Sequence, residues 1–164
     1  MRALDRFHRA QDASDEGFAQ AVDELRRGRK TSHWIWYIFP QLSGLGASAM
    51  AVRYGLDGPD EGIAYLTDHV LADRLLQAAS AVRTHVVPRA GAPARLEDVM
   101  GSRIDAQKLV SSLTLFMHLA RRLHTTERPD LALLADEAAA VLEAAAAQGY
   151  PACAFTERAL SLRA

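Results

Sequence analysis

The chain has 164 residues, is 49% hydrophobic and 24% charged, and carries a formal net charge of -1. This length and composition are typical of one soluble globular domain that needs no metal or disulfide to hold its core. The balanced charge excludes a nucleic-acid binder that relies on a large excess of basic residues, although a local basic patch stays open. The single cysteine excludes an internal disulfide.

The N-terminal stretch MRALDRFHRAQDASDE is charged and lacks the apolar core of a secretory signal or an anchor. No apolar run approaches the roughly 18 residues that a membrane-spanning helix needs. We therefore expect a cytoplasmic protein that makes no membrane contact. No spacing of Cys and His resembles a zinc site, and no cofactor motif is visible, so neither a metal nor a cofactor is expected.

Helical periodicity begins near the N-terminus. Phe18, Val22 and Leu25 recur at helical spacing between Ser14, a candidate N-cap, and Gly28, a candidate C-terminal glycine. This spacing predicts an amphipathic helix over residues 15–27.

The next segment, SHWIWYIFPQ at residues 32–41, is almost continuously apolar and closes at Pro40. Periodicity does not distinguish a buried strand from a buried helix in so short a run. Ser32 as a candidate N-cap and the helical surroundings favour a helix.

The rest of the chain also reads as helices separated by short breaks. The segment PRAGAPA at residues 88–94 is expected to be a mobile loop, and Asp68 (or Thr67) and Ser102 are candidate N-caps. The further helices are expected at residues 48–56, 60–66, 68–86, 95–100, 103–124, 130–148 and 155–160. No alternating β pattern is present, so the sequence predicts an all-α fold.

The predicted architecture is a single compact multihelical domain over residues 1–164, with roughly six to eight helices of mixed length. Residues 4–116 carry the distinctive motifs, and residues 130–162 contribute the C-terminal helices.

The helix at 103–124 carries polar residues on its apolar side. On a helical wheel Asp105 and Ser112 fall on the buried stripe and Lys108 lies at its edge, whereas Gln107, Thr114, His118 and Arg121 point to solvent. One interpretation is an ion pair between Asp105 and Lys108 at the start of the helix. The other is the floor of a polar pocket, because a buried charge must be paired or functional.

The aromatic segment offers a second group of candidates. If it is helical, His33, Trp36 and Tyr37 share a face, next to the basic run that ends at Lys30 and close to Gln41. A structural histidine is the plainer interpretation of His33, and a catalytic or ligand-binding one is the alternative. The chain has 17 Arg and only two Lys, Lys30 and Lys108, so a compact ammonium is a candidate requirement at both positions.

These segments resemble a bacterial family known as domain of unknown function 1810. The resemblance runs from Leu4 to Phe116 and continues more weakly to the C-terminus; it implies a single multihelical domain and brings no established activity. The chain has Ile35 and Leu113 where the family usually has Met, and it differs between Gly101 and Asp105. The motif positions that match are Arg6, Phe7, Gln11, Lys30, Ser32, His33, Trp34, Trp36, Phe39, Pro40, Gln41, Gly44, Gly46, Gly101, Asp105, Lys108, Ser111, Ser112, Thr114 and Phe116.

The leading functional hypothesis is a cleft between the segments SHWIWYIFPQ and DAQKLVSSLTLF that binds an anionic, nucleotide-like small molecule over Trp36. Hydrolysis is an option within it, with Asp105 as general base and His33 or Lys108 as acid. The predicted ligand-binding residues are Lys30, Ser32, Trp36, Gln41 and Ser112.

Two other functions compete with this one. The first is a non-catalytic protein-interaction or dimerisation module, which predicts an exposed Trp34 or Trp36 and a homodimer. The second and weaker one is a nucleic-acid contact through Arg26, Arg27, Arg29 and Lys30; against it, charges at a helix end usually face solvent and suit the helix dipole.

Overall fold

The computed structural model describes residues 3–162 and is all-helical. Apart from an isolated parallel bridge between Leu42 and Leu56, this part of the chain contains no β structure. Its ten helices are α1 (Asp5–Gln11), α2 (Phe18–Arg26), α3 (Ile35–Ile38), α4 (Ala49–Tyr54), α5 (Gly58–Thr67), α6 (His69–Val86), α7 (Leu96–Met100), α8 (Arg103–Leu123), α9 (Pro129–Ala147) and α10 (Ala154–Ser161).

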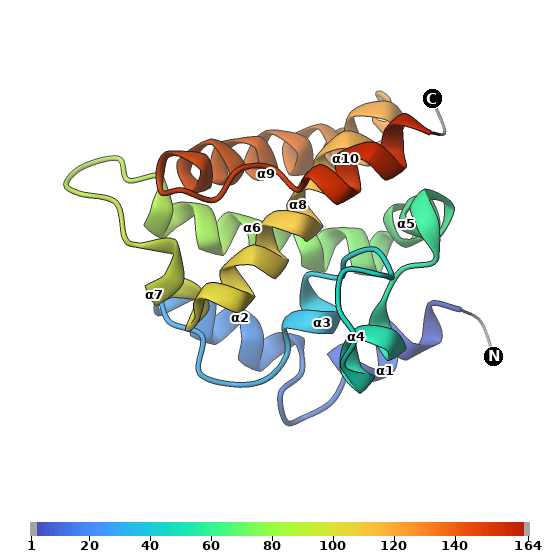
Figure 1. Ribbon diagram of the computed structural model, residues 1–164, viewed down its shortest axis with the longest axis horizontal. Coiled ribbons are helices and arrows are strands. Elements are labelled where there is room, and N and C mark those ends of the chain that lie inside the picture. The colour runs from blue at the N-terminus through green and yellow to red at the C-terminus, as the bar shows by residue number, and fades with distance from the viewer. Residues whose placement is uncertain (1–2, 163–164) are drawn as a thin grey trace.

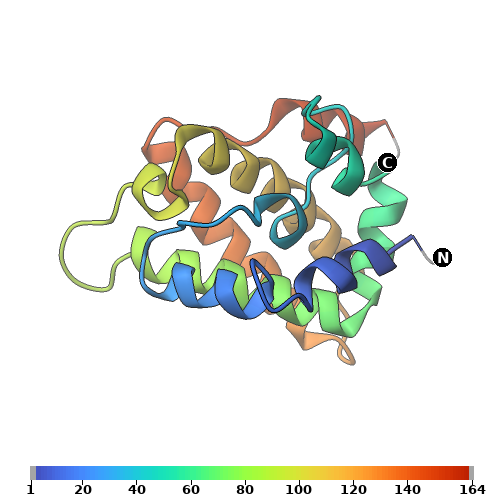
Figure 2. The ribbon, with the colours of Figure 1, turned by 90° about the horizontal axis from the view of Figure 1, so that it is seen from below.

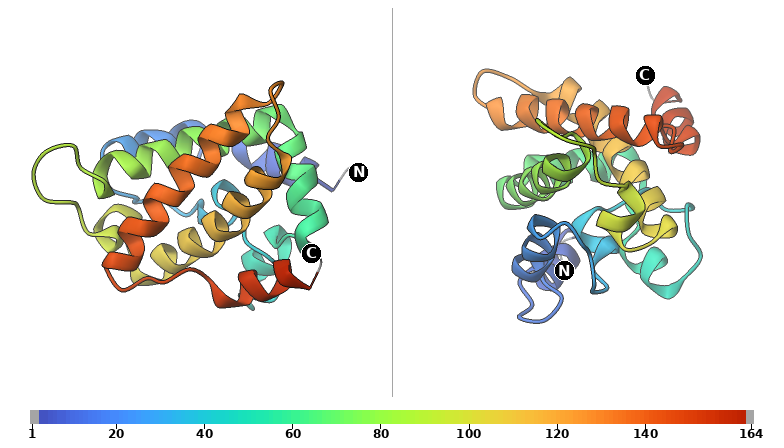
Figure 3. Two further views of the ribbon diagram at one scale, coloured as in Figure 1. Left: turned by 90° about the horizontal axis from the view of Figure 1, so that it is seen from above. Right: turned by 90° about the vertical axis from the view of Figure 1, so that its left-hand side faces the viewer.

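The helices form three layers (Figures 1 and 3). Helices α9 and α10 cover one side, α6 and α8 lie in the middle, and α1 to α4 cover the other side. The long helix α9 packs on both α6 and α8. Seen from below, α3 lies against α8, and α4 lies beside α3 (Figure 2). The middle layer is therefore covered on both faces.

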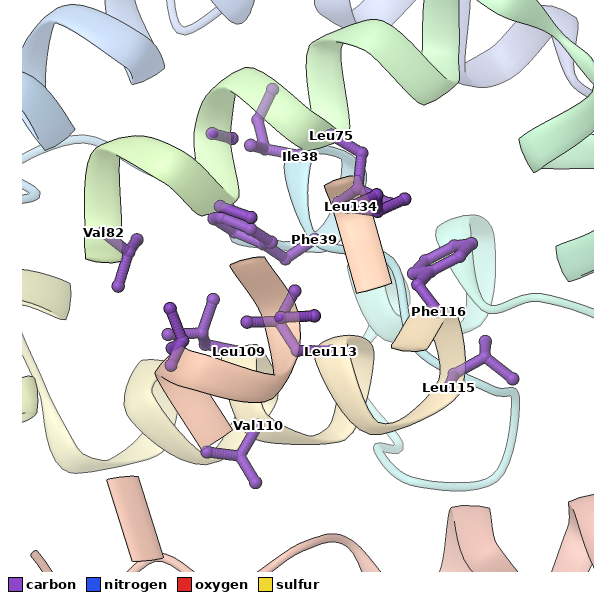
Figure 4. Close-up of a cluster of buried hydrophobic side chains, with 14 of the residues drawn as sticks. Ile38, Phe39, Leu75, Val82, Leu109, Val110, Leu113, Leu115, Phe116 and Leu134 are labelled. Atoms are coloured by element: carbon purple, nitrogen blue, oxygen red, sulfur yellow. The ribbon is translucent and has the colours of Figure 1, made fainter. Parts of the chain in front are cut away.

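The core joins all three layers. Phe39, which follows α3, is fully buried among side chains of α6, α8 and α9, including Val82, Leu113 and Leu134 (Figure 4). Burial of large apolar side chains such as these contributes roughly 1.5–3 kcal/mol each. Among the described residues, none of the helices has the length and the apolar character required to span a bilayer.

Capping residues explain where the long helices begin. The Oδ1 atom of Asp68 accepts hydrogen bonds from the backbone N–H groups of Val70 and Leu71 at the start of α6. Ser102 Oγ accepts one from the N–H of Asp105 at the start of α8. Both caps satisfy donors that a helix leaves unpaired at its N-terminus, as the sequence predicted.

The all-α prediction is confirmed, but the predicted number of six to eight helices is too small. The structure has ten helices over residues 3–162, and several contain only four to seven residues. One of them, α1 at Asp5–Gln11, had no predicted counterpart. Short helices escape sequence periodicity because they span only one or two turns.

The helix predicted over residues 32–41 is confined to Ile35–Ile38, and Ser32 does not cap it. Trp34 occupies the N-cap position, while the Ser32 hydroxyl accepts a hydrogen bond from Gln20. The backbone N–H of Ser32 is held by Glu24 of α2. This contact with another helix holds the start of the segment in a non-helical path.

Candidate functional site

The segment between α2 and α3, residues 27–34, is held in place by one carboxylate. Glu24 is buried and accepts hydrogen bonds from the backbone N–H groups of Thr31 and Ser32, the Thr31 hydroxyl and the Trp34 indole. Burial by itself would raise the pKa of Glu24, but the hydrogen bonds from Thr31, Trp34 and Ser32 lower it overall. An ionised Glu24 therefore fixes the path of the chain that leads into α3.

This path places Lys30 beside the first turns of α8. Its Nζ atom lies 2.8 Å from Oδ2 of Asp105, donates to the Ser32 carbonyl and lies 5.0 Å from the centre of a Trp34 ring. The Lys30 side chain is only 7% exposed. Lys30 is thus a buried cation whose charge is already paired.

Lys108 has a different environment, although it too lies close to Asp105. Its Nζ atom is 4.0 Å from Oδ1 of Asp105 and 4.6 Å from the centre of a Trp36 ring. Burial lowers the pKa of Lys108, and the Lys30 charge lowers it further, while Asp105 opposes both effects. The predicted pair of Asp105 and Lys108 exists, but Asp105 is bound more closely to Lys30.

A small pocket lies where α3, α4 and α8 meet. Its interior volume is about 10 Å³, which is room for about one water molecule. Of the residues that line it, Trp36, Ala51, Gly55 and Lys108 are half-buried and the others are buried. The complete lining consists of Ile35, Trp36, Phe39, Gln41, Ala51, Tyr54, Gly55 and Lys108.

Each polar side chain of this lining carries a hydrogen-bond donor, and none is acidic: Trp36, Gln41, Tyr54 and Lys108. Within residues 3–162, the indole N–H of Trp36 is buried without an acceptor. Gln41 is 8% exposed as a whole residue, and its side-chain amide forms no hydrogen bond within the same residues. Buried polar groups are normally paired, so the Trp36 indole N–H points to a missing acceptor at this pocket.

The backbone holds Gln41 rigidly at this place. Its carbonyl accepts from the N–H of Leu56, and the Leu56 carbonyl accepts from the N–H of Ser43, both at 2.9 Å. These bonds form the bridge between Leu42 and Leu56 and bring the chain after α3 beside the end of α4. The pocket wall is therefore built from three separate segments of sequence.

Comparison with known proteins was made for the whole chain. A family model described as a protein of unknown function, DUF1810, matches residues 1–129. The chain belongs to this family. The match contains every residue that lines the pocket and ends at the first residue of α9.

A solved structure is also similar. The crystal structure of the conserved hypothetical protein Rv1873 from Mycobacterium tuberculosis is 36% identical in sequence, with a TM-score of 0.63. The alignment covers 82% of this chain and 85% of that chain. No curated protein matches. The family resemblance is thus established, and it assigns no activity.

The family positions in the two sequence motifs divide into two groups in space. Trp36, Gln41 and Lys108 line the pocket, and Asp105 lies next to Lys108. Lys30 lies behind Asp105 and does not line the pocket.

His33 and Ser32 also lie outside the pocket lining. The His33 side chain is 79% exposed, and its Nδ1 atom is 3.0 Å from Oε1 of Glu16. The Ser32 hydroxyl is bonded to Gln20. The geometry therefore leaves His33 apart from Lys108, with a carboxylate partner of its own.

Ser112 is buried within the helical layers rather than at the pocket. It has no exposed surface, and its hydroxyl has no partner among the described residues. Thr114 was predicted to face solvent, but it is fully buried and donates to the Val110 carbonyl. The prediction was wrong because the chain before α10 covers that side of α8, where the N–H of Cys153 donates to the Thr114 hydroxyl.

Sequence analysis missed Tyr54 and Ala51 of α4, both part of the pocket. They belong to a third segment, and only the short predicted helix at 48–56 pointed to it. It also missed Glu24 and Glu16, whose roles depend on the path of residues 27–34. No group of three or more His, Cys, Asp or Glu residues within residues 3–162 is placed to hold a metal ion.

Proposed function

We propose that the pocket between α3, α4 and α8 binds the anionic group of a small molecule, with Lys108 as the charged contact. The single observation that carries this proposal is the buried indole N–H of Trp36, which has no acceptor within residues 3–162 and lies at a pocket lined by three further donors, Gln41, Tyr54 and Lys108. A buried donor without a partner costs about 1–3 kcal/mol, so an acceptor that enters the pocket recovers this cost.

The charges around the pocket support an anion. Asp105 is engaged by Lys30 at 2.8 Å, so it neutralises Lys108 only in part, from 4.0 Å. Two ammonium groups then share one carboxylate. Because Lys108 lies in a partly desolvated place, its attraction for an anion is stronger there than in bulk water.

We do not extend the proposal to hydrolysis or to base stacking. His33 is exposed and paired with Glu16, so the arrangement offers Lys108 no histidine partner. The Lys108 ammonium lies over Trp36 at 4.6 Å, which occupies a ring face that a base would need.

The alternative of an interaction module required an exposed tryptophan. Trp34 has no exposed surface, and Trp36 is half-buried beneath Lys108. Lys30 is likewise buried and paired, which removes the cation nearest α3 from the basic run considered for nucleic acid. The pocket is the feature that favours a small ligand over either macromolecule.

The two tryptophans provide a direct test by ¹H–¹⁵N NMR spectroscopy. The Trp34 indole N–H donates to Glu24, whereas that of Trp36 has no acceptor in the part of the chain that the structure describes. Titration with formate, acetate, phosphate and sulfate at constant ionic strength is expected to move the Trp36 indole signal and leave that of Trp34 in place. The chain has two Trp residues, so Trp34 is an internal control in the same spectrum.

Two variants make the test specific. Lys108→Met removes the ammonium and is expected to abolish the shift of Trp36. Arg121→Met removes an exposed charge from the far end of the same helix and is expected to retain it. The proposal fails if no anion moves the Trp36 signal, or if Lys108→Met responds as the unmodified chain does.

A further inference from the structure

Resting on the proposed function, we infer that the group taken up by the pocket is a carboxylate carried on a small apolar body, and not a phosphate. The inference follows from three properties of the site: its net charge, its size and its donor chemistry.

The net charge suits a single negative charge. Lys30 and Lys108 contribute two positive charges and Asp105 one negative charge, all within a chain of contacts of 2.8 and 4.0 Å. A carboxylate balances the remaining charge of one. A phosphate monoester carries about -1.5 to -2 near pH 7 and would add uncompensated charge next to Asp105.

The size of the pocket also favours a carboxylate. An interior of about 10 Å³ admits about one oxygen atom or water molecule. A flat carboxylate can insert one edge and leave its second oxygen near Lys108. A tetrahedral phosphate presents a wider group in every orientation.

The donor groups of the pocket each suit a single oxygen atom. They are an ammonium, an indole N–H, an amide and a phenol, from Lys108, Trp36, Gln41 and Tyr54. No arginine is among the residues that line this pocket, so the planar fork that commonly binds phosphate is missing from it.

The apolar residues of the lining favour an apolar carbon group in the ligand. Ile35, Phe39 and Ala51 place apolar surface beside the donors. Such a mixture suits a carboxylate joined to an alkyl or aryl carbon, since the donors bind the oxygens and the apolar wall contacts the carbon. A second charged group at that end of the ligand would be left without a partner.

The experiment compares three probes by the same Trp36 indole signal at pH 7 and constant ionic strength: propionate, inorganic phosphate and propionamide. Propionate is expected to bind at least about tenfold more tightly than either of the others, a factor that corresponds to about 1.4 kcal/mol. Propionamide has nearly the shape of propionate without its charge, so it isolates the electrostatic part.

The outcomes separate this inference from the proposed function. If phosphate binds as tightly as propionate and depends on Lys108, the anion site stands and the carboxylate inference is overturned. If propionamide binds as tightly as propionate, the required charge is absent and both proposals fall. If none of the three probes moves the Trp36 signal, both fall as well.

Variants of the wall give an independent check. Gln41→Met and Tyr54→Phe each remove one donor at nearly constant volume, and each is expected to weaken propionate binding by about threefold to tenfold. Ala51→Val narrows the pocket and is expected to weaken it at least as much. Unchanged propionate affinity in all three variants would contradict the inference, provided that the Trp34 signal shows an intact fold.

Asp105→Asn tests the charge argument directly. It removes the negative charge next to Lys108, so phosphate is expected to gain affinity relative to propionate. A ratio of the two affinities that stays constant would show that charge does not set the preference. If this variant folds poorly, the comparison of propionate with phosphate on the unmodified chain still tests the inference.

Discussion

The Nζ atom of Lys30 lies 2.8 Å from Oδ2 of Asp105, and this ion pair joins the segment before α3 to the first turn of α8. Both side chains are largely buried, at 7% and 17% exposure. Lys108 lies farther from Asp105 and lines the pocket. The two lysines of the chain thus have different environments: Lys30 is buried in an ion pair, and Lys108 lines the pocket.

Lys30→Met is expected to lower the free energy of unfolding by about 3 kcal/mol, because it leaves the Asp105 carboxylate buried without its closest partner. Lys108→Met is expected to lower it by less than about 1 kcal/mol, since Asp105 keeps Lys30. Urea unfolding of both variants measures the difference. Equal losses would show that the two lysines share the structural role.

A second relationship fixes the same segment to α7. Gly101 ends α7 at a φ of +82°, and a Cβ atom there would lie 2.7 Å from the Lys30 carbonyl oxygen. Gly101→Ala is expected to destabilise the fold by more than about 2 kcal/mol, because the strain of a left-handed backbone adds to a clash with main chain.

Gly91→Ala is the matched control for this prediction. Its φ is +83°, and no atom of residues 3–162 lies within 4 Å of the added Cβ atom. It is therefore expected to show the backbone strain alone, about 1 kcal/mol. If thermal unfolding shows the same loss for both variants, the close approach to Lys30 does not contribute.

Glu24 gives a prediction on acid stability. Its folded-state pKa is lower than its ordinary value of 4.5, since the hydrogen bonds from Thr31, Trp34 and Ser32 outweigh the effect of burial. A depressed pKa means that the unfolded chain binds the proton more readily, so the stability from Glu24 is present above pH 4.5. It is lost as the pH falls through the folded-state pKa.

Glu24→Gln is expected to cost about 2 kcal/mol at pH 7, because the amide nitrogen cannot accept the hydrogen bonds of an oxygen. It is also expected to lose less stability than the unmodified chain on acidification. Glu61 and Asp68 have lowered pKa values as well, so a residual acid dependence remains. Parallel losses in the two proteins from pH 7 to acid would contradict the role of Glu24.

The long helices could be predicted because their signals are local. The apolar periodicity of α6, α8 and α9 and the caps at Asp68 and Ser102 depend only on residues within a few turns. The aromatic segment 32–41 could not be resolved in this way. The non-helical path of residues 31–34 depends on Glu24, a residue of another helix whose hydrogen bonds no local pattern reveals.

The site could be predicted only in part for the same reason. Polar residues on an apolar helix face pointed to Lys108, and the aromatic segment pointed to Trp36 and Gln41; the structure brings these three together. The position of His33 depends on the path of the chain before α3, and Tyr54 reaches the pocket from a third segment. Such relationships are set by tertiary packing, which spacing along one helix does not contain.

The pH dependence of ligand binding tests the role of Lys108 most directly. Burial and the Lys30 charge hold the pKa of Lys108 below its ordinary value of 10.5, so the ammonium is lost at a lower pH than in an exposed lysine. Propionate affinity is therefore expected to stay constant from neutral pH and then to fall before pH 10.5 is reached.

Lys108→Arg keeps its charge throughout this range, so its affinity is expected to remain level. Tyr54→Phe leaves Lys108 in place, so it is expected to show the same fall as the unmodified chain. A fall that persists in Lys108→Arg, or that vanishes in Tyr54→Phe, would assign the titrating group to a residue other than Lys108.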